Sequence, residues 1–265
     1  MRSAFAALLA AALAAVPAAA QLSVVSSTVA EHRARPGETY TGTIVLRNAG
    51  PVPQEARLYQ TDYRFFADGR TLFEAAGGRP RSNAGWITLS PSRLVVPAGS
   101  EATVGYTVTV PAAGAAAGSH WSMVMVEAVG ADSPEAAGRR GRVEVGIRAA
   151  VRYGVQVATH LEGGESRVEF ARVAVAAGPA GARALELDLA NAGDRAYRLD
   201  LSVEIFDAQG APAGKLAARR GLLYPGSSLR QSFALPALPP GSYKALVIAD
   251  TGGDEVFGGD FTLKL

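Results

Sequence analysis

Apolar and polar residues alternate over a long stretch of the chain, residues 141–160. The apolar members occupy odd positions, as follows: Val143, Val145, Ile147, Ala149, Val151, Tyr153, Val155 and Val157. A two-residue period places the two sets of side chains on opposite faces of a β-strand. A strand over residues 143–157 would measure roughly 50 Å at ~3.3 Å per residue, which is longer than most strands. The pattern therefore predicts one exceptionally long strand.

The rest of the chain is a series of short β-branched and aromatic runs separated by Gly, Pro, Asn and Asp. Regular turn signals between short strands are typical of all-β sandwiches. The runs fall into two sets of about seven or eight strands, the content of one immunoglobulin-like sandwich each. We therefore predict two tandem immunoglobulin-like β-sandwiches, at residues 21–158 and 159–265, with the polar, glycine-rich HLEGGES (160–166) at their junction.

The two halves also share short sequence patterns. TIVLRNAG in the first half and LDLANAGD in the second both end a strand on an Asn-Ala-Gly turn. Two explanations fit this similarity. The sandwiches descend from one ancestor, or the same turns have selected the same residues independently.

The N-terminal segment MRSAFAALLAAALAAVPAAAQ has the parts of a secretory signal peptide over residues 1–20. Arg2 is basic, Phe5 to Val16 is apolar, and small residues precede Gln21. A buried alanine-rich helix is the alternative. The signal peptide predicts an exported protein. We expect it in the periplasm, and a secreted or surface-associated location is the alternative. No later run is apolar enough for a membrane helix, so we expect no membrane insertion of the mature chain.

Composition excludes several classes of function. The chain has no cysteine, which rules out disulfides, thiol catalysis, thiolate metal sites and attachment of lipid to a cysteine. There are 26 basic and 24 acidic residues, and so small a surplus predicts no nucleic-acid partner. We find no G-x-S-x-G, H-E-x-x-H, phosphate-binding or EF-hand pattern. We therefore predict a protein that is not an enzyme, with no catalytic residue, no metal site and no cofactor.

Individual residues carry further expectations. The segment DTGGDE (250–255) contains Asp250, Asp254 and Glu255, which fit either a calcium site or a Gly-Gly hairpin between two strands. His160 lies in the expected junction, where we predict a solvent-exposed residue. Trp86 and Trp121 lie in alternating runs, and we expect both to be in strands and largely buried.

The first domain resembles the periplasmic chaperones of the chaperone–usher pilus pathway and related exported bacterial immunoglobulin-like domains. The resemblance is carried over residues 22–158 by TGTIVLRNAGPVPQEARLYQTDY, by WITLSPSRLVVPAGSEATVGYTV, and by HWSMVMVEAVG followed by VEVGIRAAVRYGVQV. In that family the long last strand of the first domain completes an unfinished pilin subunit by strand addition. The resemblance therefore implies a protein partner, a pilin-like or other envelope subunit.

By this resemblance, the partner-binding strand presents Val143, Val145, Ile147, Ala149 and Val151. The same residues also fit one core strand that ends near Val151, with bulges or bends at Gly146 and Gly154.

The family also holds the terminal carboxylate of its subunit with a basic pair in the cleft between the domains. Arg152 matches the position of the lysine at the end of the last strand. Arg33 and Arg35 match the region of the arginine near the first strand, as does His32. The aromatic-Arg-Pro sequence that follows the lysine in the family is absent from this chain.

Three hypotheses follow. The first is a non-enzymatic periplasmic chaperone of the pilus type. The second is a structural or adhesive component of the cell envelope that uses the same surface for permanent contacts. The third, an enzyme or a metal-dependent carbohydrate-binding protein, has no motif in its favour.

Overall fold

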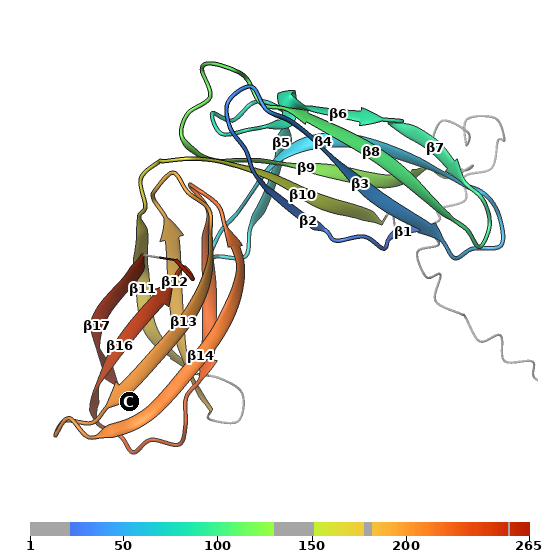
Figure 1. Cartoon of the computed structure of the whole chain (residues 1–265). Helices are drawn as coiled ribbons and strands as arrows, with labels where there is room; N and C mark the ends of the chain where they lie inside the picture. The colour runs from blue at the N-terminus through green and yellow to red at the C-terminus, as the bar shows by residue number, and fades with distance from the viewer. Residues whose placement is uncertain (1–21, 130–150, 178–181, 254) are drawn as a thin grey trace, which may run out of the picture.

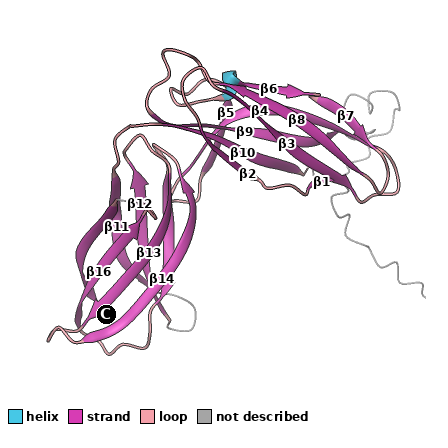
Figure 2. Ribbon diagram, in the orientation of Figure 1, coloured by secondary structure: helices cyan, strands magenta, loops and turns pink. Residues whose placement is uncertain are grey.

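The chain forms two β-sandwiches in tandem, which confirms the predicted all-β fold (Figure 1, Figure 2). The computed structural model describes residues 22–129, 151–177, 182–253 and 255–265. The predicted signal peptide lies outside these residues. Within them, the only helical element is a 3-10 turn, η1 (Ala84–Trp86), and no helix is long and apolar enough to cross a membrane.

The N-terminal sandwich consists of two sheets. The first has the order β1-β3-β8-β6 and comprises β1 (Leu22–Val24), β3 (Thr39–Asn48), β8 (Glu101–Thr109) and β6 (Ile87–Ser90). The second has the order β2-β10-β9-β4-β5, with β7 also paired to β4. It comprises β2 (Val29–Arg33), β10 (Arg152–Leu161), β9 (Gly118–Val129), β4 (Gln54–Phe65), β5 (Thr71–Ala75) and β7 (Arg93–Val96).

Alternation along these strands builds the core of the N-terminal sandwich. Ile44 and Leu46 on β3 face Val124 and Val126 on β9, and all four side chains are fully buried. Val155 of β10 belongs to the same cluster. From Tyr153 to Val157, the odd-numbered face of the long alternating segment is therefore the core face.

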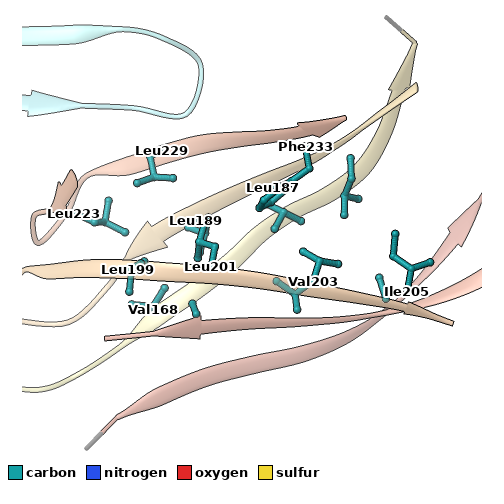
Figure 3. Packing of buried hydrophobic residues seen from close by; sticks show 14 of the residues in the cluster. Val168, Leu187, Leu189, Leu199, Leu201, Val203, Ile205, Leu223, Leu229 and Phe233 are labelled. Atoms are coloured by element: carbon teal, nitrogen blue, oxygen red, sulfur yellow. The ribbon is translucent and has the colours of Figure 1, made fainter. Parts of the chain in front are cut away.

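The C-terminal sandwich has a three-stranded and a four-stranded sheet. The first, β11-β12-β15, comprises β11 (Val168–Ala177), β12 (Arg183–Asn191) and β15 (Ser228–Ala234). The second, β14-β13-β16-β17, comprises β14 (Pro212–Leu223), β13 (Tyr197–Phe206), β16 (Ser242–Asp250) and β17 (Val256–Lys264). Leucines of β12 and β13 meet between the sheets, as Figure 3 shows for Leu187, Leu189, Leu199 and Leu201.

The junction between the sandwiches is short. The last strand of the N-terminal domain continues to Leu161, three residues past the boundary predicted at residue 158, and the next strand begins at Val168. A Cβ on Gly164 would lie 3.0 Å from the Cα of Gly118 and 2.9 Å from the Cβ of Asp194. Glycine at this position therefore lets the connection pass closely between the two domains.

The first Asn-Ala-Gly turn is organised by Asn48, which is fully buried. Its Nδ2 donates to the carbonyl groups of Val52 (2.7 Å) and Val96 (3.0 Å). Its Oδ1 accepts from the backbone N–H of Gly50 at 2.9 Å. One side chain thus satisfies three backbone groups where β3 turns away from the sheet.

The second Asn-Ala-Gly turn repeats this arrangement around Asn191. Its Nδ2 donates to the carbonyl groups of Arg195 (2.7 Å) and Leu223 (2.9 Å), and its Oδ1 accepts from the N–H of Gly193 (3.0 Å). The sequence similarity of the two halves therefore reflects one hydrogen-bonded corner, present at the same point of each sandwich.

The two tryptophans differ from each other. Trp121 on β9 is buried, as predicted, and its indole N–H donates to the carbonyl of Tyr63 at 2.8 Å. The prediction that Trp86 lies in a strand was wrong, although its ring packs against the core. It closes the turn η1 rather than lying in a strand, and it is half-buried, with its ring centroid 4.6 Å from that of His120. A 3-10 turn breaks the two-residue period, so alternation did not reveal which way this ring faces.

Candidate partner-binding edge and interdomain cleft

Strand β10 has different neighbours on its two sides. On one side it pairs with β9 along its whole length, from Arg152 opposite Glu127 to Leu161 opposite Gly118. On the other side it pairs in parallel with β2, and only from Gln156 onward.

The first strand of the chain changes sheets, and this leaves part of the β10 edge open. Its beginning, β1, pairs with β3 in the opposite sheet, and only its continuation, β2, reaches β10. The backbone N–H of Gln156 donates to the carbonyl of Thr28 (2.8 Å), so this N–H points to the open side. Because backbone groups alternate along a strand, those of Arg152 and Gly154 point the same way. Within the described residues, no strand pairs with them there.

Of the five predicted partner-binding residues, the structure describes Val151 alone. Val143, Val145, Ile147 and Ala149 lie outside the described residues. Val151 continues the core-facing row of Tyr153, Val155 and Val157 but is 44% exposed. An apolar side chain therefore extends the row beyond its own core, next to the open edge.

The expectation that the strand ends near Val151 or bends at Gly154 was wrong. The β9–β10 register runs without a shift through Gly154, which lies opposite Met125. A Cβ at this position would lie 2.2 Å from the Sδ of Met123. The glycine therefore makes room for the packing of Met123 and does not interrupt the strand.

A buried polar network forms hydrogen bonds to the second half of β10, beyond the open edge. The Nδ2 of Asn83 donates to the carbonyl of Val157 (3.1 Å) and to the Oγ1 of Thr159 (3.0 Å). The Oδ1 of Asn83 accepts from the Ser122 hydroxyl (2.7 Å), and the hydroxyls of Tyr40 and Thr159 lie 2.8 Å apart. These contacts fix the residues around Thr159 against the rest of the domain, and nothing in the local sequence signals them.

The structure does not bring the three candidate anchor arginines together. Arg33 and Arg35 line a cleft of about 1110 Å³ between the two domains. Arg152 lies at the other end of β10, where it forms an ion pair with Glu127 at 3.3 Å. Arg33 is opposite His160, so β10 separates it from Arg152 by roughly 26 Å at ~3.3 Å per residue. A hydrogen bond from Arg57, together with the charge of Arg152, lowers the pKa of Glu127.

The other charged groups of the cleft are largely paired with one another. Arg195 pairs with Glu255 at 3.1 Å, and His32 Nε2 lies 3.1 Å from Glu38 Oε1. Arg33 and Arg35 are exposed and have no ion pair in the part of the chain that the structure describes. Two free guanidinium groups at one end of the cleft are suited to binding a carboxylate.

The prediction for His160 was also wrong. Because β10 continues through it, His160 is half-buried rather than an exposed linker residue. Its Nδ1 lies 2.8 Å from the Oγ of Ser119, and its Nε2 lies 3.5 Å from a carboxylate oxygen of Glu31. Burial lowers the pKa of His160, although the Glu31 carboxylate acts in the opposite direction.

Contacts on both sides of the cleft join the two sandwiches. The Trp121 ring stacks on Tyr224 of the second domain, with centroids 4.8 Å apart. The backbone N–H of Ser119 donates to the carbonyl of Asp194 (2.8 Å), and the carboxylate of Asp194 pairs with Arg81. These residues lie far apart in the sequence, and no local pattern indicates that they meet.

The segment 250–255 forms the hairpin between β16 and β17. Asp250 accepts a hydrogen bond from the N–H of Gly252 (2.8 Å), and Glu255 accepts from the hydroxyl of Ser166 (2.5 Å). Asp254, the third candidate cation ligand, lies outside the described residues. Among those described, no group of three or more His, Asp or Glu side chains is arranged to hold a metal ion.

No protein-family model matches the chain, and no curated protein sequence matches it. Solved structures do resemble it. A chain of a chaperone–tip adhesin complex from CFA/I fimbriae biogenesis is 10% identical, with a TM-score of 0.48, and the match covers 92% of this chain and 99% of the other. The class 5 fimbriae chaperone CfaA is 11% identical, with a TM-score of 0.46, and the match covers 92% of this chain and 99% of the other.

A third similar structure is the CsuC–CsuE chaperone–tip adhesion subunit complex of Acinetobacter baumannii. The identity is 13% and the TM-score 0.43, and the match covers 92% of this chain and 98% of the other. Each of the three structures is of a chaperone, or of a chaperone–subunit complex, from fimbriae or pili.

Proposed function

We propose that the protein is a non-enzymatic periplasmic chaperone of the pilus type, which binds partner subunits by adding their strand to the open edge of β10. The observation that carries this proposal is the half-paired strand: β2 covers β10 only from Gln156 onward. An unpaired strand edge is a template for another chain and an aggregation hazard, which proteins normally blunt with charges, prolines or a covering segment. Val151 beside this edge is apolar and exposed, and the one charged side chain next to it, Arg152, is paired with Glu127.

A partner strand laid along this edge would gain main-chain hydrogen bonds from the backbone of Arg152 and Gly154. Its specificity would come from alternate side chains that meet Val151 and the apolar positions before it in the sequence. The similar structures include a chaperone–tip adhesin complex and a chaperone–tip adhesion subunit complex, which supports a protein partner.

We further propose that Arg33 and Arg35 hold the terminal carboxylate of the partner in the interdomain cleft. Both are exposed there, whereas Arg152 is paired with Glu127 at the other end of β10. A guanidinium can bind a carboxylate through two parallel hydrogen bonds, which gives direction as well as affinity. A structural or adhesive component of the envelope would use the same edge, but would keep its partner instead of releasing it.

The edge is tested with Ile147→Glu and Val151→Glu, and Val256→Glu is the matched control. Val256 begins β17, an outer strand of the second domain, and is 58% exposed. We expect the first two variants to lose the capture of native envelope proteins in a pull-down, with melting temperatures close to that of the wild type, because a charge prevents apolar side chains from docking. The control should bind normally. Wild-type capture by all three variants would refute binding at this edge.

The anchor is tested separately with the double variant Arg33→Ala/Arg35→Ala. Arg47→Ala serves as the control, because this exposed arginine lies on β3 in the other sheet and pairs with Glu101. We expect the double variant to weaken capture about tenfold or more without loss of stability. Arg152→Ala should leave the carboxylate contact intact. If only Arg152→Ala weakens capture, the anchor lies at the other end of β10.

A further inference from the structure

A second, smaller recess lies between the two sandwiches. It has a volume of about 250 Å³. The N-terminal domain contributes Phe65 and Gln156 to its wall, and the C-terminal domain contributes Arg198, Arg220 and Leu229. Its lining differs in chemistry from that of the larger cleft, because it contains two arginines and no aspartate or glutamate among the described residues.

The polar groups of this recess are mainly hydrogen-bond donors. The Nε of Arg220 is buried and has no hydrogen-bond partner among the described residues, in which Arg220 also has no ion pair. Arg198 binds Glu31, with 3.0 Å between its Nε and the carboxylate. The Oε1 of Gln156 accepts from the Tyr224 hydroxyl (2.9 Å), which leaves the amide NH₂ of Gln156 as a donor. A buried donor without an acceptor is costly and calls for a partner from outside.

A β-bulge places Arg220 in the recess. In the β13–β14 ladder, Arg198 lies opposite Leu222 and Asp200 lies opposite Arg219, so Arg220 and its neighbour occupy an irregular step. Bulges redirect side chains and are frequent beside functional sites. Arg219 points to solvent, where it is 82% exposed and pairs with Asp200 at 3.1 Å, whereas Arg220 lies against the second recess.

The remaining wall is apolar. Phe65 and Leu229 face the recess from different domains, and the buried Tyr63 and Leu222 extend the same surface. The volume is below the ~300–1,000 Å³ of sites for drug-sized ligands, so about ten non-hydrogen atoms are the upper limit. The recess therefore combines an anion-binding group with a small apolar wall.

We propose that this recess binds a small organic carboxylate with an apolar or aromatic body. The carboxylate lies against the guanidinium of Arg220 and the amide of Gln156, and the body packs between Phe65 and Leu229. Because each domain contributes one polar and one apolar contact, the bound acid ties the two sandwiches together. It therefore stabilises the folded protein by RT ln(1 + [L]/Kd), where [L] is the concentration of free acid.

The test is a titration of the mature chain with phenylacetate, in which binding is measured by isothermal calorimetry and by NMR. Neutral phenylacetamide is the ligand control. We expect wild-type binding with a Kd on the order of 1 mM, because few contacts are available to so small a ligand. Arg220→Gln should weaken it tenfold or more, and the matched variant Arg219→Gln should leave it within twofold. Phenylacetamide should bind at least tenfold more weakly than phenylacetate.

If Arg220→Gln does not fold, the variant Val29→Phe takes its place. Val29 lines the same recess, and the larger ring would fill it while leaving every charge in place. Loss of phenylacetate binding in folded Val29→Phe supports the proposal. Three results would each overturn it. The first is no wild-type binding at 20-fold the expected Kd, or about 20 mM. The others are equal weakening by Arg219→Gln and Arg220→Gln, and unchanged binding by Val29→Phe.

Discussion

The two sandwiches share a corner but differ in how they use their first strand. In the C-terminal domain the first strand, β11, stays in one sheet and pairs with β12 from end to end, with one irregularity near Phe170. In the N-terminal domain the first strand divides between the two sheets as β1 and β2. The same kind of scaffold therefore supports both arrangements, and in the described part of the chain the divided strand leaves the first half of β10 without a neighbour on that side.

The outer strands show the consequence of this difference. The edge strand β17 of the C-terminal domain carries Asp260 and Lys264 among its residues, and charges on an edge discourage pairing with other chains. The described part of the open β10 edge has Val151 and Tyr153 in its core-facing row. Each edge thus has an exposed valine and at least one charged residue, and the β10 edge differs in that its apolar row continues directly from the buried core to Val151.

The largest effect should follow the loss of the contact that joins the domains at Trp121. Trp121→Ala removes a buried ring that stacks on Tyr224 and donates to the carbonyl of Tyr63. We expect a loss of about 3–5 kcal/mol in the free energy of unfolding, measured by chemical denaturation. The half-buried Trp86 provides the control, and Trp86→Ala should cost less. Equal losses in the two variants would show that the contacts of Trp121 contribute no more to the free energy of unfolding than those of Trp86.

The shared corner can be broken once in each domain. Asn48→Ala and Asn191→Ala each leave two carbonyl groups and one N–H without their side-chain partner. We expect each to cost about 2–4 kcal/mol, because unsatisfied buried polar groups cost ~1–3 kcal/mol each and water replaces some of the lost bonds. Both tryptophans lie in the N-terminal domain, although Trp121 also contacts Tyr224 of the second. The midpoint followed by tryptophan fluorescence should therefore change more with Asn48→Ala than with Asn191→Ala. The reverse order would show that the corners are not equivalent.

A pH titration should distinguish the domains further, because all three histidines lie in the N-terminal one. Burial lowers the pKa of both His120 and His160. The unfolded chain, with histidine pKa values near ~6.5, then binds protons that the folded domain does not. The stability contributed by these residues is complete above the unfolded value and is lost as the pH falls through the folded one.

We therefore expect the midpoint of the fluorescence-detected transition to decrease between pH 7.5 and 5.5, and the change to be smaller in His160→Gln. A decrease of the same size in the variant and the wild type would exclude His160 as a source.

The smallest effect on stability should come from a charge placed at each edge. Val151→Glu and Val256→Glu change exposed side chains, and both should alter the free energy of unfolding by less than about 0.5 kcal/mol. The comparison then rests on binding, which only Val151→Glu should affect. A loss of several kcal/mol in Val151→Glu would instead place this side chain in a core.

Much of the fold was predictable because its signals are local. Alternation revealed strands with an inward odd-numbered face around Val155, and the Asn-Ala-Gly turns marked the same corner twice. The candidate site was less accessible. Val151 lies beside the open edge, and its role in partner binding stays a prediction. Arg152 proved to be far from Arg33, and His160 belongs to a strand instead of a linker. In each case the local sequence did not indicate where β10 begins and ends or which strands lie beside it.

By itself, the sequence determined the all-β class, the two tandem sandwiches and the buried face of each alternating run, because a two-residue period is a property of neighbouring residues. Only the tertiary structure decided that the first strand divides between sheets, that Trp121 meets Tyr224, and that a bulge places Arg220 between the domains. These features depend on strand pairing and register over long sequence separations. Many pairings satisfy the same alternation, and the packing of the whole chain selects among them.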